Sequence, residues 1–326
     1  MLGDNLSVSA LGYGAMVVAG VYSDISSESG LATLNSAVDQ GVTFIDTADV
    51  YGTGNNEELL SRLLADRRDA ITIATKFGIR PVMPGTSEAH MTARGDRDYV
   101  LAACDASLTR LGIDTIDLYY MHRRDLSVPI QETVGAMAEL VTAGKVRHLG
   151  LSEVTGAELE AAVAVHPIAA VQSEWSIWSR DVEETVVPTA ARLGVGFVPY
   201  SPLGRGFLTG KLNILGDRDF RNTVPRFAGD NLSRNEVVIG VIRTIADELG
   251  ATAAQVSLAW LRHRAATLGV ASVPIPGTRS PARISENIGS LAIELTRGQV
   301  AQLDSLVKVV SGARSPDLSW VSQGRE

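Results

Sequence analysis

Residues 41–52 read Gly-Val-Thr-Phe-Ile-Asp-Thr-Ala-Asp-Val-Tyr-Gly, in which a β-branched and apolar run, residues 43–46, ends in a carboxylate. A polar loop that contains Tyr51 follows this run. Such a short and nearly continuous apolar run is typical of a parallel strand that is covered on both faces. Gly41 stands where a C′ glycine would close a preceding helix. The stretch therefore predicts a helix, then a buried parallel strand, then a loop of functional interest.

The same unit repeats along the whole chain. Similar apolar runs occupy residues 71–75, 117–121, 148–152, 170–173, 196–200 and 272–275, and residues 10–14 supply an eighth. Segments with helical spacing of apolar residues alternate with them, at residues 26–40, 56–65, 97–111, 130–143, 156–165, 182–193, 235–249, 253–264 and 281–289. Regular alternation of strand and helix predicts a parallel sheet, either open and doubly wound or closed into a barrel.

Three observations favour the barrel. No Pro/Gly/Ser-rich linker long enough to separate two domains interrupts the eight units. Gly12-Tyr13-Gly14 lacks the third glycine of the dinucleotide fingerprint that a doubly wound sheet carries in its first turn. Polar side chains follow the C-terminal ends of the predicted strands, which converge on one face of a barrel; they are Asp46, Lys76, His122, Ser152, Gln172 and Ser201. We predict an α/β fold, a single (β/α)₈ TIM barrel over residues 1–326, with a mobile loop at residues 211–234 on the active face.

Composition narrows the class of protein. The 326 residues are 45% hydrophobic and 20% charged, as in a chain that buries a large core. Lys and Arg number 29 and Asp and Glu 37, a net charge of −8 without a basic run, which argues against nucleic acid or an anionic membrane as partner. Cys104 is the single cysteine and the five histidines show no paired spacing, so neither a disulfide framework nor a metal is expected. The N-terminal residues have no basic and apolar signal pattern, and we expect a cytoplasmic protein.

Asp46, Tyr51, Lys76 and His122 form the candidate catalytic group. Each has an ordinary structural explanation when it is taken alone, but four such residues at three adjacent strand ends are unlikely to be without function. A lysine ammonium about 4 Å from a tyrosine hydroxyl interacts with the tyrosinate by ~1–4 kcal/mol, which makes the hydroxyl a stronger acid. Asp46 would pair with Lys76, and His122 would hydrogen-bond the same substrate oxygen. The group predicts delivery of a proton to a carbonyl oxygen, beside a hydride donor.

These stretches resemble the aldo-keto reductase superfamily, and the resemblance covers nearly the whole chain. Residues 41–52, 74–76 (Ala-Thr-Lys), 117–122 (Asp-Leu-Tyr-Tyr-Met-His) and 144–152 (Gly-Lys-Val-Arg-His-Leu-Gly-Leu-Ser) carry it, in the order that the barrel requires. The resemblance implies the same TIM barrel and the reduction of small aldehydes or ketones to alcohols, without an obligate protein partner. It makes Tyr51 the general acid and base, with Asp46, Lys76 and His122 as its partners.

The resemblance also implies an NADPH/NADP+ site. Ser152 and Gln172 are similar to the residues that hydrogen-bond the nicotinamide carboxamide, and Glu153 stands where many members have Asn. The other implied cofactor residues are Tyr200 under the nicotinamide ring, Ser201, Leu203, Gly204 and Arg205 at the pyrophosphate, Gly277, Thr278, Arg279 and Arg283 at the 2′-phosphate, and Glu286 and Asn287 at the adenine. Many members carry lysine where this chain has Gly277. Two arginines on one short loop favour NADPH over NADH, because a guanidinium pairs with phosphate through two hydrogen bonds.

Substrate recognition and two other functions stay open. Tyr22, Trp178 and the loop at residues 211–234 are candidates for an apolar pocket wall, although Trp178 is equally suited to packing. One alternative is an NADPH-binding regulatory or sensor barrel with little turnover, which potassium-channel β subunits resemble; the intact catalytic group argues against it. The other is a lyase that forms a Schiff base on Lys76, which has no use for Tyr51 or for the two arginines of the phosphate site.

Overall fold

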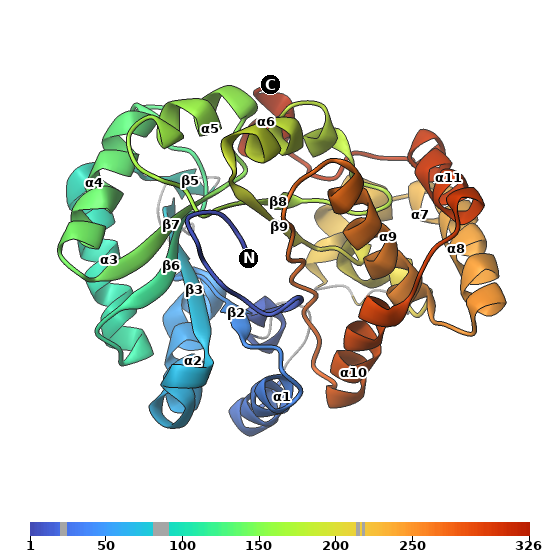
Figure 1. Cartoon of the computed structure of the whole chain (residues 1–326), viewed down its shortest axis with the longest axis horizontal. Helices are drawn as coiled ribbons and strands as arrows, with labels where there is room; N and C mark the ends of the chain where they lie inside the picture. The colour runs from blue at the N-terminus through green and yellow to red at the C-terminus, as the bar shows by residue number, and fades with distance from the viewer. Residues whose placement is uncertain (20–24, 81–90, 213–215, 217–218) are drawn as a thin grey trace.

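The computed structural model describes residues 1–19, 25–80, 91–212, 216 and 219–326. Seven strands form one sheet in the order β1-β2-β3-β6-β7-β8-β9, and all neighbouring strands are parallel. Figure 1 shows helices around these strands, as the barrel prediction requires. The strands are β1 (Gly12–Gly14), β2 (Phe44–Asp46), β3 (Thr72–Phe77), β6 (Ile116–Met121), β7 (Val146–Ser152), β8 (Ala170–Glu174) and β9 (Gly196–Tyr200).

The segment predicted as the eighth strand closes the barrel without forming a regular strand. Ser272 makes one isolated parallel bridge with β9. The amide of Ile275 donates to the carbonyl of Pro199 (3.1 Å), and on the other side the amide of Gly12 donates to the carbonyl of Pro274 (2.9 Å). Because proline has no amide hydrogen, a continuous ladder cannot form here. The closed (β/α)₈ fold is therefore confirmed, whereas the prediction of a full strand at residues 272–275 is wrong.

Nine of the observed helices correspond to the predicted helical segments. They are α1 (Ser27–Asp39), α2 (Asn55–Arg67), α3 (Arg97–Leu111), α4 (Ile130–Thr142), α5 (Gly156–Val163), α6 (Val186–Leu193), α8 (Glu236–Leu249), α9 (Ala253–Thr267) and α10 (Pro281–Gly289). Gly112, Gly194 and Gly250 close three of them in the left-handed conformation, with φ of 65°, 68° and 60°, where a side chain would be strained. Helix α11 (Arg297–Ser305) was not predicted, although Thr296 and Gln299 form a capping box at its start.

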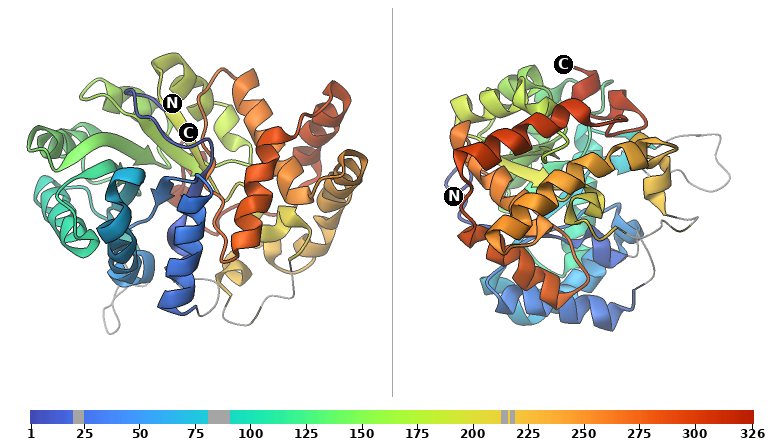
Figure 2. Two further views of the ribbon diagram at one scale, coloured as in Figure 1. Left: turned by 60° about the horizontal axis from the view of Figure 1, so that its bottom comes forward. Right: turned by 90° about the vertical axis from the view of Figure 1, so that its right-hand side faces the viewer.

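Further segments lie outside the barrel repeat. Strands β4 (Ile79–Arg80) and β5 (Thr92–Ala93) form an antiparallel pair after β3. Helices α8, α9 and α11 pack side by side at one edge of the molecule (Figure 2). The range 211–234 contains short helical turns at Phe220–Thr223 and Pro225–Phe227 and the helix α7 (Asn231–Arg234). Residues 213–215 and 217–218 lie outside the described part, so the mobility of this loop stays a prediction.

The pleat of the strands places polar side chains at one end of the barrel. Alternate residues of a strand point into the barrel, and the others point toward the helices. The apolar interior positions are Phe44, Ala74, Leu118, Tyr120, Ala170 and Val198. Two residues further along three of these strands, the interior positions are Asp46, Lys76 and Gln172. The same periodicity that builds the core thus brings these polar groups together at the C-terminal face.

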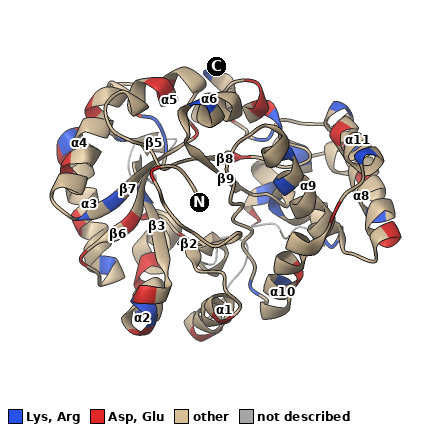
Figure 3. Cartoon of the chain, in the orientation of Figure 1, with Lys and Arg blue, Asp and Glu red and all other residues tan. Residues whose placement is uncertain are grey.

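The N-terminal residues close the opposite end. Residues 1–9 form a turn instead of paired strands, and the amide of Gly3 donates to the carbonyl of Ala169 (2.9 Å). The side chains of Leu2 and Leu6 are buried against the interior cluster. Figure 1 shows this segment lying across the end of the barrel. Acidic and basic residues are interspersed on the outer helices (Figure 3), and no helix of the described residues is long and apolar enough to cross a membrane.

Candidate active site

The four predicted catalytic residues lie at adjacent strand ends. Asp46 is the last residue of β2, Lys76 lies one residue before the end of β3, and His122 follows β6 directly. Tyr51 begins a short helical turn, Tyr51–Gly54, that follows β2. Two backbone hydrogen bonds tie the intervening loop to β3: the amide of residue 47 donates to the Ala74 carbonyl (2.8 Å), and that of residue 49 to the Lys76 carbonyl (3.0 Å). This loop therefore holds Tyr51 over the end of β3.

Asp46 and Lys76 form a buried ion pair. Their side chains are 2% and 0% exposed, and the Nζ of Lys76 donates to Oδ1 of Asp46 and to the carbonyl of Thr47 (2.8 Å). Oδ2 of Asp46 accepts a hydrogen bond from Nε2 of Gln172 (2.8 Å). Burial raises the pKa of Asp46 and lowers the pKa of Lys76, while their mutual attraction opposes both shifts. The end of β2 and the residue after it thus hold the ammonium, and Gln172 of β8 holds the partner carboxylate.

Tyr51 and His122 flank this pair. The Nζ of Lys76 lies 5.3 Å from the centre of the Tyr51 ring, and the rings of Tyr51 and His122 meet edge to face with their centres 5.9 Å apart. Burial, reinforced by the charges of Arg123 and Lys76, lowers the pKa of His122 well below its ordinary value. Its Nδ1 is buried and has no hydrogen-bond partner among the described residues. The histidine is therefore a neutral imidazole at physiological pH, and Tyr51 is the most exposed member of the group.

The residues predicted at the nicotinamide lie next to the catalytic group. Ser152 ends β7 and stands opposite Gln172 of β8, and both side chains are buried. Tyr200 ends β9, and its hydroxyl donates to Oε1 of Glu153 (2.7 Å). Burial and the charge of Glu153 raise the pKa of Tyr200. Gln172 thus connects Ser152 to Asp46, and Tyr200 is joined to Glu153, the residue after Ser152.

Glu153 is the centre of a second buried ion pair. Arg314 donates to both of its carboxylate oxygens (2.9 and 3.0 Å) and also to Asp181 (2.9 Å), and Ser322 donates its amide to Glu153 Oε2 (3.0 Å). Burial opposes ionisation of Glu153, but the charge and hydrogen bonds of Arg314 outweigh it and lower the pKa of this carboxyl far below its ordinary value. We call Glu153, Asp181, Tyr200, Arg314 and Ser322 the Glu153 cluster. It fixes the C-terminal segment to the loop after β7.

The predicted pyrophosphate loop has an unusual backbone. Ser201 and Arg205 are non-glycine residues with positive φ (48° and 55°), and they lie beside Gly204 and Gly206 (56° and 96°). Left-handed non-glycine residues are uncommon and are concentrated at functional sites. A Cβ at Gly204 would lie 2.7 Å from the Trp178 indole, so close packing requires glycine there. The loop is held in a tight, strained turn at the C-terminal face.

Trp178 itself belongs to the core. It is 1% exposed, stacks on Phe207 with ring centres 4.6 Å apart, and meets Phe227 edge to face at 5.7 Å. These contacts account for Trp178 as a packing residue, and its contact with a substrate stays a prediction. Tyr22, the other candidate for substrate contact, lies outside the described residues.

The predicted 2′-phosphate and adenine residues gather around the start of α10. Arg279 and Arg283 are exposed on either side of Pro281, and Asn287 is buried in the same helix. The hydroxyl of Tyr13 donates to the carbonyl of Thr278 (2.5 Å), which ties this segment to β1. The remaining predicted residues are close by: Gly277 precedes Thr278, and Oε1 of Glu286 lies 3.5 Å from Nζ of Lys211.

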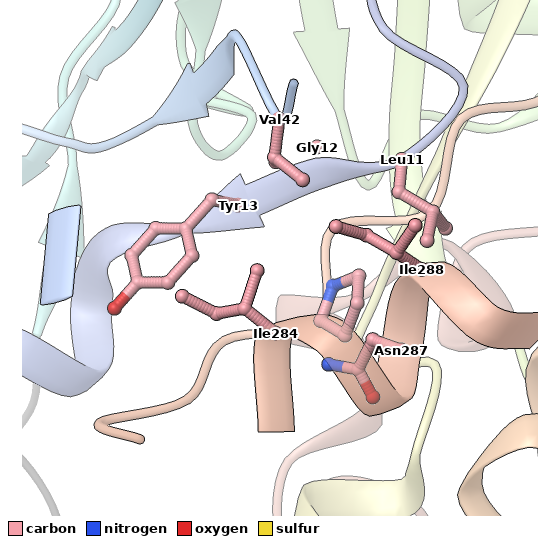
Figure 4. A pocket seen from close by; sticks show the side chains of 8 residues that line it. Leu11, Gly12, Tyr13, Val42, Ile284, Asn287 and Ile288 are labelled. Carbon is pink, nitrogen blue, oxygen red and sulfur yellow. The ribbon is translucent and has the colours of Figure 1, made fainter. Parts of the chain in front are cut away.

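The segment before α10 approaches β1 closely. A Cβ at Gly277 would lie 2.5 Å from the carbonyl oxygen of Gly14, so any residue other than glycine would require this backbone to shift. A cavity of about 10 Å³, room for about one water molecule, lies between β1 and α10 (Figure 4). It is bordered by Tyr13, Ile284 and Asn287 and is too small to hold a substrate.

Comparison with known proteins identifies the family. The model of the Aldo/keto reductase family matches residues 10–308, so this chain belongs to that family. Its structure is similar to that of the glycerol dehydrogenase AKR11B4 from Gluconobacter oxydans, with 25% identity over 97% of each chain and a TM-score of 0.85. It is also similar to the thermostable aldo-keto reductase Tm1743, solved with the inhibitor epalrestat, with 30% identity over 94% of this chain and 98% of that one and a TM-score of 0.73. The protein is accordingly an oxidoreductase of small carbonyl compounds, and its family uses NAD(P)H.

Two arginines of the site were not predicted from the sequence. Arg123 follows His122, and its Nη1 donates to the His122 carbonyl (2.7 Å) and to Oγ of Ser152 (3.2 Å). Its position directly after a strand end was the signal that could have identified it. Arg314 carries no such signal, because it lies in an irregular segment 161 residues away from Glu153.

Proposed function

We propose that this protein reduces aldehydes or ketones to alcohols with NADPH, and that Tyr51 donates the proton. The observation that carries the proposal is the fully buried ammonium of Lys76, paired with Asp46 and placed 5.3 Å from the Tyr51 ring centre. A fixed positive charge beside a phenol stabilises the phenolate that proton donation leaves behind. The substrate oxygen would lie between the Tyr51 hydroxyl and the neutral imidazole of His122, which donates a second hydrogen bond.

The cofactor assignment rests on the donors that the C-terminal face offers. Bound NADPH supplies the hydride. Ser152 and Gln172, which stand opposite each other on β7 and β8, would hold the carboxamide of the nicotinamide, and Tyr200 at the end of β9 would stack on its ring. Arg279 and Arg283, exposed at the start of α10, have the fork geometry and the helix N-terminus that suit a 2′-phosphate. The Nε of Arg123 is buried and has no hydrogen-bond partner among the described residues, which supports an oxygen ligand at this face.

Contacts of Lys76 disfavour the lyase alternative. Its ammonium is wholly buried and donates to both Asp46 and the Thr47 carbonyl, so it is neither a free amine nor open to a carbonyl carbon. Borohydride treatment with candidate carbonyl compounds, without nucleotide, is expected to leave Lys76 unmodified. The regulatory alternative predicts NADPH binding without turnover on a panel of aldehydes and ketones. The cytoplasmic location stays a prediction.

Replacement of Tyr51 tests the function. We expect Tyr51→Phe to lower kcat by about 10²–10⁴-fold, because the proton donor is lost, while NADPH affinity changes by less than about twofold. Steady-state kinetics on the best carbonyl substrate and a fluorescence titration measure the two quantities.

Tyr120→Phe is the matched control. The Tyr120 ring also lies close to Lys76, with its centre 5.8 Å from Nζ, but its hydroxyl is buried in the barrel interior. Its activity is expected to stay near that of the wild type. Full activity in Tyr51→Phe, or an equal loss in both variants, would contradict the assignment.

A further inference from the structure

The carboxylate of Glu153 is not available to a ligand. It accepts two hydrogen bonds from Arg314, one from the hydroxyl of Tyr200 and one from the amide of Ser322, and it is 0% exposed. A carboxylate also has no hydrogen to donate. If the nicotinamide lies beside Ser152, as the proposed function requires, its carboxamide oxygen receives no donor from position 153.

Next to Glu153 in the structure lies the cation Arg123, which is not paired with a carboxylate of the described residues. Among the described residues, no Asp or Glu oxygen lies within 4.0 Å of its guanidinium, and its Nε is buried without a hydrogen-bond partner. Its Nη1 donates only to neutral oxygens, those of His122 and Ser152. A half-buried guanidinium offers five hydrogens in a fixed fork, and leaving some of them unpaired and shielded from water is costly. The side chain is therefore prepared for another oxygen acceptor.

The electrostatic surroundings locate that acceptor. The charge of Arg123 lowers the pKa of His122 and Lys76 on one side, after burial in each case, and acts on Glu153 and Tyr200 on the other. By its contacts, the guanidinium bridges the carbonyl of His122 and the hydroxyl of Ser152, and the next residue after Ser152, Glu153, accepts a hydrogen bond from the Tyr200 hydroxyl. If the nicotinamide stacks on Tyr200 and its reacting carbon faces Tyr51 and His122, as the proposed function requires, its carboxamide would lie beside this guanidinium.

We propose that Arg123 donates a hydrogen bond to the carboxamide oxygen of the nicotinamide. Arg123 thereby fills the role that Glu153, locked by Arg314, cannot fill. This inference rests on the proposed function, since it requires a nicotinamide cofactor. A carboxylate on the substrate is the competing ligand for the same guanidinium, and the experiment separates the two.

Cofactor analogues give the test. Fluorescence titration of the wild type and Arg123→Met uses NADP+, its thionicotinamide analogue, in which a poorly accepting sulfur replaces the carboxamide oxygen, and its 3-acetylpyridine analogue, which keeps the oxygen. We expect the wild type to bind NADP+ and the acetylpyridine analogue about 10-fold or more tightly than the thio analogue. In Arg123→Met the first two affinities fall to that of the thio analogue, and affinity for NAD+ falls by the same factor.

Two further variants keep the test decisive. Arg124→Met is the matched control. Arg124 pairs with Glu158 (3.1 Å), and Glu158 keeps Arg325 as a partner when Arg124 is removed. This variant should discriminate between the cofactor analogues as the wild type does. Arg123→Lys, which preserves the charge, is used if Arg123→Met does not fold. This variant should discriminate less between the cofactor analogues but should still bind them. Unchanged discrimination in Arg123→Met and Arg123→Lys overturns the proposal, and a KM increase confined to carboxylate-bearing aldehydes would assign Arg123 to the substrate. A wild-type protein that binds none of the nucleotides would contradict the proposed function itself and remove Arg123 from a cofactor role.

Discussion

Two buried ion pairs stand at the C-terminal face of the barrel, and they differ in what surrounds them. Asp46–Lys76 joins two neighbouring strands whose residues are 30 positions apart, whereas Glu153–Arg314 joins a loop to a segment 161 positions away. Both are almost wholly inaccessible to water. Beside the first pair, the Nδ1 of His122 has no hydrogen-bond partner in the described part of the chain, while the carboxylate of the second pair accepts hydrogen bonds at both oxygens.

The difference shows that a buried ion pair alone is not a sign of catalysis. The cost of burying charge is met in both places by close opposite charge and hydrogen bonds. Beside Asp46–Lys76, the imidazole of His122 keeps a ring nitrogen without a partner among the described residues, whereas the carboxylate of Glu153 is fully engaged by Arg314, Tyr200 and Ser322. We therefore propose that the first pair takes part in the chemistry, and that the second fixes the C-terminal segment and the Tyr200 hydroxyl.

Removal of Arg314 should have the largest effect on stability. Arg314→Met leaves the Glu153 carboxylate buried without its cation, and such a change costs about 3–5 kcal/mol in the free energy of unfolding. Urea denaturation measures it. The matched control is Arg192→Met, since Arg192 pairs with Glu160 on the surface, where both side chains are more than half exposed. That change is expected to cost less than about 1 kcal/mol.

A double variant refines this result. Glu153→Gln with Arg314→Met removes both charges, and it should cost less than the sum of the two single changes because neither charge is left unpaired. Additive costs, or equal losses in Arg314→Met and Arg192→Met, would show that the Glu153 cluster contributes little.

Asp49 tests the comparison with a smaller expected effect. It is a carboxylate near Asp46–Lys76, and no arginine of the described chain holds it as Arg314 holds Glu153. The Oδ1 of Asp49 is buried and finds no hydrogen-bond partner among the residues that the structure describes, and burial together with the charge of Glu57 raises its pKa to about 7. Since the unfolded carboxyl ionises near pH 4, the folded state loses stability from this group as pH rises from about 4 to 7. Asp49→Asn should therefore raise Tm by roughly 2–5 °C at pH 8 and change it little at pH 4.5. Thermal unfolding followed by circular dichroism at both pH values checks this, and an equal shift at both would refute the pKa argument.

The sequence allowed prediction of those features that follow from local periodicity. Apolar runs, helical spacing and C′ glycines located the strands and helices, and strand ends located Asp46, Lys76 and His122. The prolines around residues 272–275 stop a regular ladder without opening the barrel, which an apolar pattern does not reveal. Arg314 could not be found because its partner is distant in the chain and its segment has no repeating pattern.

The predicted cofactor residues act through contacts with a bound nucleotide, and such contacts follow neither from the sequence pattern nor from the side-chain positions alone. Arg279 and Arg283 lie at the start of α10 and Tyr200 at the end of β9, and their use by NADPH stays a prediction. Glu153 illustrates the limit, since its position matches a ligand-contacting residue of similar sequences while its carboxylate is occupied by Arg314.

The most direct measurement is titration of the purified protein with NADPH and NADH, followed by quenching of its intrinsic fluorescence. We expect NADPH to bind at least about tenfold more tightly than NADH, and Arg279→Ala to remove most of this difference by weakening NADPH alone, because a guanidinium–phosphate contact is lost. Equal affinities for the two nucleotides would contradict the 2′-phosphate site, and binding of neither would contradict the assignment of this barrel as an NADPH-dependent reductase.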